Sequence, residues 1–365
     1  MRFSLLLLAA VCLAPAMQNP SSAELCGRCH RAIHEAWRES SHSKAMESRL
    51  FQDSLQMAEK DFGADTRKIC LSCHAPLALE SGDLQLVRKA SWEGVSCDYC
   101  HSVRDVSLEG RNPRASLAIG SNKTGPLKDV TSAAHTSSYS AVHTSSLVCA
   151  PCHEYRNALG FPVLTTYSEW SQSSFGKNDT TCQTCHMAEV KGDVVDPHIQ
   201  RAKTATINLH NMPGSNSLQQ LSGAIRAQLT TSRREDTLLV HITVSNESAG
   251  HHLPTGSPMR RIELELRADS YKGHRFQAQK VYQRRVADQA GRPLVREHFA
   301  FMKGASVISD TRLAPGEQRQ ETFSFDIPPG VPTKVEATFR YYYSPMARSE
   351  TQRRVTFLSL SRLVR

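Results

Sequence analysis

Residues 26–30, Cys26-Gly27-Arg28-Cys29-His30, place a histidine directly after two cysteines that are three positions apart. The same CxxCH pattern recurs at residues 70–74, 97–101, 149–153 and 182–186. Its cysteines are Cys26, Cys29, Cys70, Cys73, Cys97, Cys100, Cys149, Cys152, Cys182 and Cys185. Its histidines are His30, His74, His101, His153 and His186. Of the 11 cysteines in the sequence, only Cys12 lies outside the five motifs.

Two thiols at this spacing form thioether bonds with the two vinyl groups of one haem, and the next histidine then lies under the iron as its proximal ligand. Other uses of paired cysteines do not require that histidine. Disulfide frameworks and redox-active CxxC pairs place no demand on the following residue, and zinc sites take their histidines at other spacings. Histidine makes up only 16 of 365 residues, so five repeats by chance are excluded. The sequence therefore predicts five covalently bound haems c.

A closed haem iron needs a second axial ligand, and in a multihaem protein this distal ligand is most often another histidine. The predicted distal ligands are His42, His135, His143, His210 and His251. His42 follows a helix predicted over residues 32–40. His34 lies four residues after His30 on the same helix face, so we expect it to be a packing or surface residue.

The polar segment 131–146 precedes the fourth motif and contains His135 and His143. A stretch so rich in serine and threonine has too little apolar content to fold by itself. Ligation of a haem by at least one of the two histidines would order it. The alternative is a solvated loop in which both histidines are incidental.

The other two distal candidates lie in loops after the fifth motif. His210 directly precedes the loop Asn211-Met212-Pro213-Gly214. His251 belongs to Gly250-His251-His252-Leu253-Pro254-Thr255-Gly256, where glycines and a proline restrict the backbone. This second loop is either a turn between strands or a connection in which one histidine reaches back to a haem and joins two domains.

The first 16 residues are predicted to be a secretory signal peptide. Arg2 supplies a positive charge, residues 5–13 form a short apolar run, and Ala14-Pro15-Ala16 offers a cleavage site. Lipidation of Cys12 is disfavoured because the bulky Val11 precedes it. No later apolar run is long enough to span a bilayer. We expect a mature protein in the periplasm or outside the cell, with peripheral membrane association left open.

The formal net charge of +9 would ordinarily suggest an anionic partner such as nucleic acid. Five haems would bring about ten propionate groups, which are mostly ionised near neutral pH. These carboxylates would offset the excess of lysine and arginine. The charge therefore does not predict a nucleic-acid partner.

Composition changes near residue 220. All five motifs lie between residues 26 and 186, in a segment where short predicted helices, such as 61–77 and 166–174, alternate with loops. Alternating or β-rich strands are predicted afterwards, separated by glycine and proline turns. They span residues 238–244, 261–267, 322–327, 335–343 and 354–360. We predict a mainly α and irregular haem-packed domain over residues 17–220 and an immunoglobulin-like β sandwich over residues 221–365.

With these motifs placed, the chain resembles the cytochrome c554 family of multihaem proteins. The resemblance rests on residues 26–30, on Trp37-Arg38-Glu39-Ser40-Ser41-His42, and on residues 94–101. Residues 167–170 and 182–187 are similar to a wider group of exported multihaem cytochromes, in which a His-x-x-Pro-Thr-Gly loop opens a C-terminal β domain. The resemblance implies bis-histidine haems packed in pairs, with His42 and His210 as distal ligands. Cytochrome c554 itself has four haems and no such domain.

Two functions are compatible with these features. An electron carrier needs two protein ligands on every iron, and its partners would be other cytochromes or a quinol-linked membrane complex. An oxidoreductase acting on a small nitrogen or sulfur compound needs one open iron. Pentahaem nitrite reductases replace one proximal histidine by lysine, whereas all five motifs here end in histidine. The sequence therefore favours the carrier.

Overall fold

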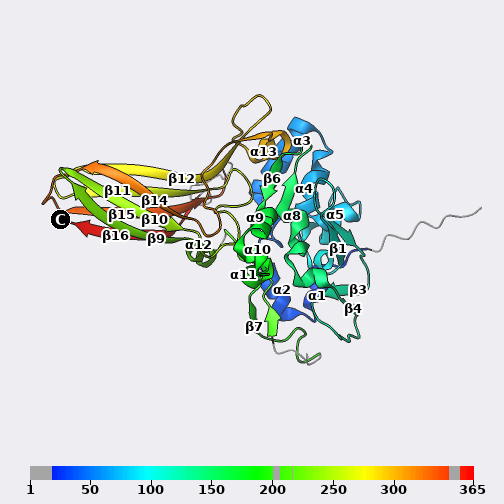
Figure 1. Ribbon diagram of the computed structural model, residues 1–365. Helices are drawn as coiled ribbons and strands as arrows, with labels where there is room; N and C mark the ends of the chain where they lie inside the picture. The colour runs from blue at the N-terminus through cyan, green and yellow to red at the C-terminus, as the bar shows by residue number, and fades with distance from the viewer. Residues whose placement is uncertain (1–18, 200–205, 216, 345–353) are drawn as a thin grey trace, which may run out of the picture.

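The computed structural model describes residues 19–199, 206–215, 217–344 and 354–365. The predicted signal peptide and Cys12 lie outside the described residues. The described chain forms two units, a rounded one that holds all five CxxCH motifs and an elongated one made of strands (Figure 1). Among the described helices, none has the length and apolar character needed to cross a bilayer.

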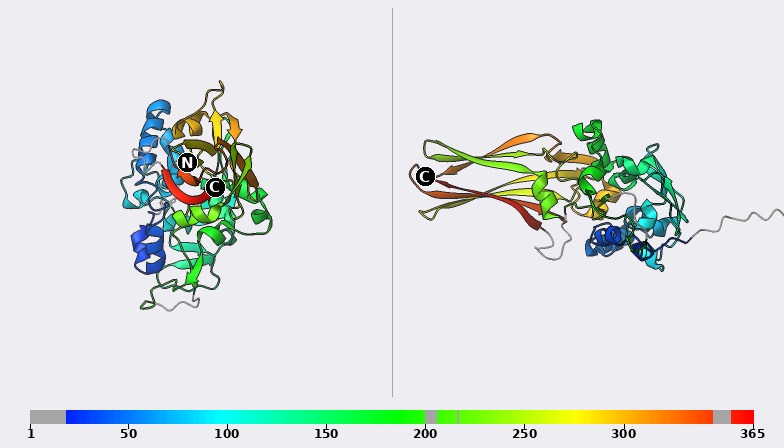
Figure 2. Two further views of the ribbon diagram at one scale, coloured as in Figure 1. Left: turned by 90° about the vertical axis from the view of Figure 1, so that its left-hand side faces the viewer. Right: turned by 90° about the horizontal axis from the view of Figure 1, so that it is seen from below.

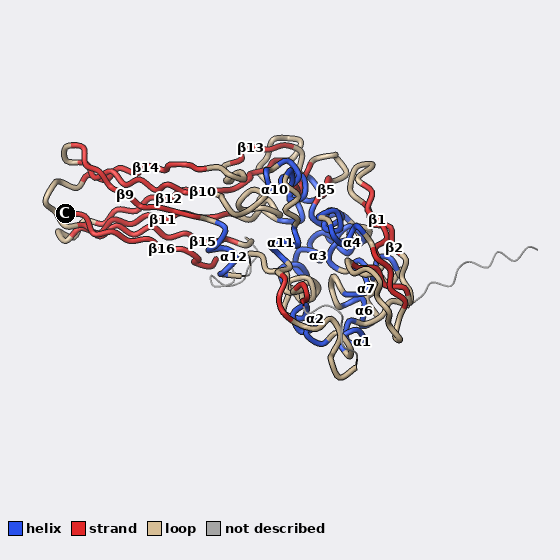
Figure 3. The backbone as a smooth tube through the Cα atoms, turned by 60° about the horizontal axis from the view of Figure 1, so that its bottom comes forward, coloured by secondary structure: helices blue, strands red, loops and turns tan. Residues whose placement is uncertain are grey.

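The motif-bearing unit is built from short helices joined by loops, which appear in blue and tan in Figure 3. They are α1 (Ala23–Gly27), α2 (Arg31–Arg38), α3 (Arg49–Phe62), α4 (Thr66–His74), α5 (Pro76–Glu80), α6 (Lys89–Trp92), α7 (Cys97–Cys100), α8 (Ala150–His153), α9 (Thr166–Gln172), α10 (Ser174–Lys177) and α11 (Cys182–His186). The longest, α3, begins where the Ser48 hydroxyl accepts from the Phe51 N–H. It then buries Phe51, Leu55 and Ala58 at helical spacing against Leu71.

Four two-stranded ribbons complete this unit, and the sequence did not predict them. They pair β1 (Val103–Ser107) with β2 (Arg114–Leu117), β3 (Asn122–Gly125) with β4 (Thr136–Tyr139), β5 (Glu154–Arg156) with β6 (Pro162–Thr165), and β7 (Glu189–Lys191) with β8 (Thr206–Asn208). The polar segment 131–146 is ordered by the parallel pairing of β4 with β3 and by a 3₁₀ turn at Ala141–Thr144. Such short pairings leave no periodic pattern long enough to detect.

The elongated unit is a β sandwich of two antiparallel sheets, seen along its length in Figure 2. Its strands are β9 (Arg226–Arg234), β10 (Thr237–Ser245), β11 (Arg261–Ser270), β12 (Arg275–Ala287), β13 (Ser306–Asp310), β14 (Gln318–Asp326), β15 (Thr333–Tyr342) and β16 (Arg354–Val364). One sheet has the order β14-β10-β9 and the other β13-β12-β11-β15-β16. The predicted fold class is confirmed, and all five predicted strands are present.

Alternation of side chains explains the sandwich. In β10 every second residue is buried, from Leu238 to Val244, and in β11 Leu264 and Leu266 are fully buried. Strand residues point alternately to the two faces of a sheet, so each sheet turns an apolar face inward. Phe339 of β15 packs in the same core. His241 lies on the outer face of β10, between Ser232 and Thr322.

A helix, an apolar cluster and buried hydrogen bonds hold the two units together. Helix α12 (Leu218–Ala224) leads into β9, and α13 (Glu297–Lys303) packs against α3. A small apolar cluster mixes both units, with Phe161 and Val163 meeting Met259 and Ala300. Buried hydrogen bonds accompany it, such as the one from Asn157 Nδ2 to the Gly304 carbonyl, 2.7 Å long. The β unit is therefore docked on the motif-bearing unit through specific buried contacts.

Candidate haem sites

Each CxxCH motif lies in a short helix or begins in one. Four of them lie within or at the end of α4, α7, α8 and α11, and the first lies at the end of α1. Residues three positions apart share one helix face, so the two thiols of a motif point to the same side. The ten motif cysteines are free thiols in the described chain. Each pair is therefore available for attachment of a haem.

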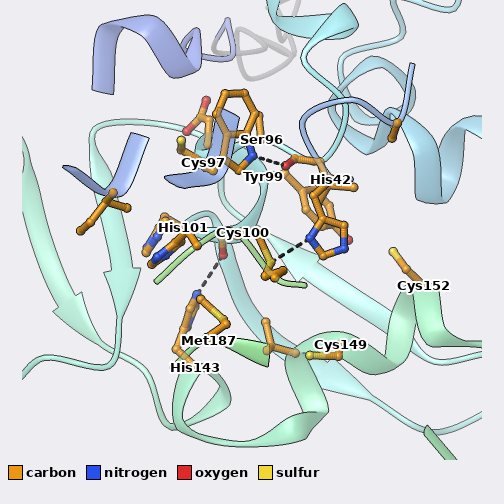
Figure 4. Close-up of a pocket in the computed structure, with 18 of the residues that line it drawn as sticks. His42, Ser96, Cys97, Tyr99, Cys100, His101, His143, Cys149, Cys152 and Met187 are labelled. Carbon is orange, nitrogen blue, oxygen red and sulfur yellow. Dashed lines mark hydrogen bonds between the residues drawn. The ribbon is translucent and has the colours of Figure 1, made fainter. Parts of the chain in front are cut away.

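A cavity of about 2190 Å³ runs through the motif-bearing unit. A single small-molecule site occupies roughly 300–1,000 Å³, so this volume suits several bound groups. The cysteines and histidines of the first four motifs line it, as do Gln183 and Thr184 of the fifth. Figure 4 shows Cys97, Cys100, Cys149 and Cys152 around one part of it. Size and lining fit a set of haems attached to these motifs.

Hydrogen bonding fixes the orientation of three proximal histidines. The Nδ1 atoms of His30, His101 and His186 lie 2.6–2.7 Å from the carbonyl oxygens of Val194, Thr124 and Pro213. A ring whose Nδ1–H donates to a carbonyl keeps its Nε2 lone pair free for a metal. Burial lowers the pKa of His74 to about 4 and the pKa of His101 and His153 to about 3. These rings are neutral near pH 7, as metal ligands must be.

Four of the predicted distal histidines lie opposite a proximal histidine. The ring centres are 6.2 Å apart for His30 with His135 and for His153 with His42. They are 6.4 Å apart for His101 with His210 and for His186 with His251. Imidazole nitrogens bind first-row metals at about 2.0–2.1 Å, so one metal between two rings separates their centres by roughly 6 Å. Each pair has room for one iron.

The four distal candidates share a second feature, which is the partner of Nδ1. This atom lies 2.7–3.0 Å from a backbone carbonyl oxygen in His135, His210 and His251. In His42 it lies 2.8 Å from the sulfur of Met212. All four rings therefore keep Nε2 available for a metal.

His143 is arranged differently. Its ring stacks on His101 with the centres 5.6 Å apart, but its Nε2 atom lies 2.9 Å from the Cys100 carbonyl oxygen. Figure 4 shows this contact as a dashed line. The Nε2 atom of His143 thus faces a carbonyl, and only its buried Nδ1 is without a hydrogen-bond partner, whereas His210 approaches the same proximal ring with Nε2 free.

His74, the proximal histidine of the second motif, has no paired imidazole among the described residues. The phenyl ring of Phe51 stacks on its face with the centres 3.8 Å apart. Side chains of α13, including His298 and Met302, line the same cavity as His74. His298 is 4% exposed and carries no sequence pattern that would have singled it out.

Contacts between the segments that carry the motifs show which attachment sites adjoin. Helix α1, with Cys26 of the first motif, contacts α7, with Cys97 of the third, and α4 of the second motif contacts α8 of the fourth. The Cys182 N–H donates to the Ser146 hydroxyl, three residues before the fourth motif, so the fourth and fifth motifs adjoin. Val103, two residues after the third motif, packs in one cluster with Val148, directly before the fourth. The third and fourth motifs are therefore also neighbours.

Comparisons with known proteins show which chains are similar in sequence and in fold. Residues 25–102 match the family model described as cytochrome c554 and c-prime. Cytochrome c-554 of Nitrosomonas europaea is 30% identical over 114 residues, which are 29% of this chain and 47% of that protein, so the match spans about half of its length.

The solved structure of a penta-heme cytochrome c552 from Thermochromatium tepidum superposes with a TM-score of 0.76 at 22% identity. The aligned region covers 95% of this chain and 99% of the cytochrome c552 chain, so the two proteins share the whole two-unit fold. Over residues 25–102 the chain is therefore similar to the cytochrome c554 family, and over its whole length it shares the fold of a penta-heme cytochrome c, with a C-terminal β domain.

Proposed function

We propose that this cytochrome is an exported electron carrier with five haems c, one on each CxxCH motif. Multihaem c-type cytochromes transfer electrons, and the observation that carries the proposal is the set of four histidine pairs with ring centres 6.2–6.4 Å apart. An iron held by two imidazoles has no free position for substrate, so it changes only its oxidation state. Other cytochromes or a quinol-linked membrane complex are the proposed partners, in the periplasm or outside the cell.

The proposed ligand sets follow from these pairs. His135 would complete the haem of His30, and His210 that of His101. His42 would complete the haem of His153, and His251 that of His186. His143 is not proposed as a ligand, because its Nε2 faces the Cys100 carbonyl.

The adjacency of the motifs supports a connected path for electrons. Haems attached to adjoining motifs would lie near one another, in the order first, third and fourth motif. The fourth motif would then branch to the second and the fifth. The first haem would form one end of the path, and the fifth would lie beside the β domain through His251.

Quantifying haem and recording the EPR spectrum of the same oxidised holoprotein tests this proposal. Five haems per chain, of which at least four are low-spin, are expected. Fewer than five haems would contradict attachment at every motif. Fewer than four low-spin haems would contradict the ligand pairs.

A second function is supported by the environment of His74. With no paired imidazole among the described residues, the haem on the second motif would keep one position for a small ligand. Arg260 lines the same cavity, and its charge reaches His74. A cation near an open iron would favour a small anion, such as an oxidised nitrogen or sulfur compound.

The test of this second function is a stoichiometric high-spin EPR signal that changes on adding nitrite or hydroxylamine. Conversion of the added compound, with the haems as electron donor or acceptor, would make the protein an oxidoreductase. Five low-spin haems whose EPR spectrum is unchanged by either compound would support only the electron-carrier function.

A further inference from the structure

Glu169 of α9 occupies an unusual position for a carboxylate. Its side chain is only 6% exposed, and it lies where the motif-bearing unit meets the β domain. Oε1 lies 2.7 Å from Nη1 of Arg312, which belongs to the β domain and is 7% exposed. The Thr165 hydroxyl also donates to Oε1, over 2.6 Å. A buried charge so fully partnered marks a position where the chain holds two segments in one geometry.

The second oxygen of Glu169 holds the loop that carries His251. Oε2 accepts from the backbone N–H of His252, over 3.2 Å, and from the Thr255 hydroxyl, over 2.8 Å. The Thr255 hydroxyl lies 2.8 Å from that of Thr166 in α9. One carboxylate thus accepts hydrogen bonds from His252, directly after His251, and from Thr255, four residues after His251.

The opposite side of the loop is held by the β domain. Asn246 Nδ2 donates to the His251 carbonyl, over 2.9 Å, and to the Leu313 carbonyl, over 3.2 Å. Leu253 and Leu313 exchange two backbone hydrogen bonds of 2.9–3.0 Å. The loop backbone is therefore fixed by Glu169 from one unit and by Asn246 and Leu313 from the other.

Close packing leaves the loop little room to shift. A Cβ atom at Gly250 would lie 3.0 Å from both Trp170 and Phe175, so the backbone touches α9 and α10 directly. Trp170 is itself fixed by a bond from its Nε1 to the Thr180 carbonyl, 2.8 Å long. The loop is wedged between these helices and the β sandwich.

We propose that Glu169 is a positioning residue that keeps His251 opposite His186, so that the β domain supplies and the motif-bearing unit locks the sixth ligand of the fifth haem. The inference rests on the proposed ligation of that haem by His186 and His251. Its physical basis is that a ligand ring 6.4 Å from its partner ring must be held to within a fraction of an ångström. Without the Glu169 contacts, the N–H of His252 and the Thr255 hydroxyl lose their shared acceptor and the loop loses one of its two anchors.

Carbon monoxide binding to the reduced full-length holoprotein tests this inference, because carbon monoxide binds haem iron only where a position is free. The Glu169→Ala variant is expected to bind one more carbon monoxide per chain than the wild-type protein, and its oxidised form to show one low-spin signal fewer. The matched control is Asn157→Ala, which removes a buried bond between the same two units at the α13 end. It is expected to match the wild type in both measurements.

His251→Ala separates failure of this inference from failure of the ligand assignment. If His251→Ala binds one extra carbon monoxide and Glu169→Ala does not, the ligand assignment holds and the positioning role is wrong. If His251→Ala binds no extra carbon monoxide, His251 is not the ligand and both fail.

Should Glu169→Ala not accumulate, Thr255→Val takes its place, since it removes one Glu169 contact and leaves the Arg312 ion pair. It is expected to bind the extra carbon monoxide more weakly than His251→Ala, and no extra binding would overturn the inference.

Discussion

The Nε2 atom of His298 lies 3.0 Å from Oδ2 of Asp61, although 237 positions separate the two residues in the chain. His298 belongs to α13, in the β domain, and Asp61 lies near the end of α3, in the motif-bearing unit. The side chain of His298 is 1% exposed, whereas that of Asp61 is 35% exposed. The ring of His298 also contacts Phe62, with the centres 6.4 Å apart. This pair is therefore a further, partly buried link between the units, far along α3 from Phe51.

Removing the acceptor should loosen that link. Asp61→Ala leaves Nε2 of His298 buried without its partner, which costs about 1–3 kcal/mol. We expect the free energy of unfolding in urea to fall by that amount. Gln56→Ala is the control, because Gln56 is an exposed residue of the same helix, and its expected change is within about 0.5 kcal/mol. Equal effects of the two substitutions would mean that the pair contributes nothing.

The features that the sequence predicted are those written in short local patterns. The CxxCH motifs need only five consecutive residues, and the strands around Leu238 and Leu264 show the alternation of half-buried sheets. The predicted helix over residues 166–174 appears as α9. Most of the predicted range 61–77 forms α4, which is separated from α3 because Gly63 ends α3.

What the sequence could not predict depends on which distant segments meet. The pairing of His42 with His153 joins residues 111 positions apart, and no periodicity encodes it. His143 and His210 are both distal candidates in the sequence, and the structure distinguishes them by the nitrogen that each ring presents to His101. The sequence also assigned no role to Glu169, since a glutamate in a helix is most often solvated.

The contrast between His143 and His210 predicts opposite results for two similar substitutions. His210→Ala is expected to convert the haem of His101 from low-spin to high-spin, because it removes the ring whose Nε2 is free. His143→Ala is expected to leave the number of low-spin haems unchanged, because its Nε2 faces the Cys100 carbonyl. EPR of the two oxidised variants, each with its haem content measured, decides between them. The reverse result would make His143 the ligand.

His42 and His34 offer a second matched pair within one short segment. His42→Ala is expected to remove one low-spin signal, assigned to the haem of His153, while covalent attachment keeps five haems per chain. His34 packs on Trp37, with the ring centres 5.5 Å apart, and has no proximal histidine opposite it among the described residues. His34→Ala should therefore retain every low-spin signal. Loss of a signal in both variants would point to a general loosening of this segment instead.

The last prediction concerns Glu297, at the start of α13. Burial raises the pKa of this carboxyl above its ordinary value, against the opposing effect of its hydrogen bond from Ser344. Because the folded-state pKa is the higher one, the unfolded chain releases this proton first as the pH rises. Below about pH 4, burial of Glu297 therefore does not lower the free energy of unfolding. As the pH rises through the folded-state pKa, this free energy decreases.

Glu297→Gln keeps the shape and the hydrogen-bonding capacity of the side chain but cannot ionise. Its urea midpoint is expected to match that of the wild type near pH 4 and to exceed it at about pH 8, with the gap growing between these values. Glu109→Gln is the control, since Glu109 is exposed in the loop between β1 and β2. A variant that is less stable than the wild type at pH 8 would mean that the ionised Glu297 is stabilised by a partner. Arg260 is a cation whose charge acts on Glu297, so that result would assign Arg260 to an ion pair and remove it from the proposed anion site beside His74.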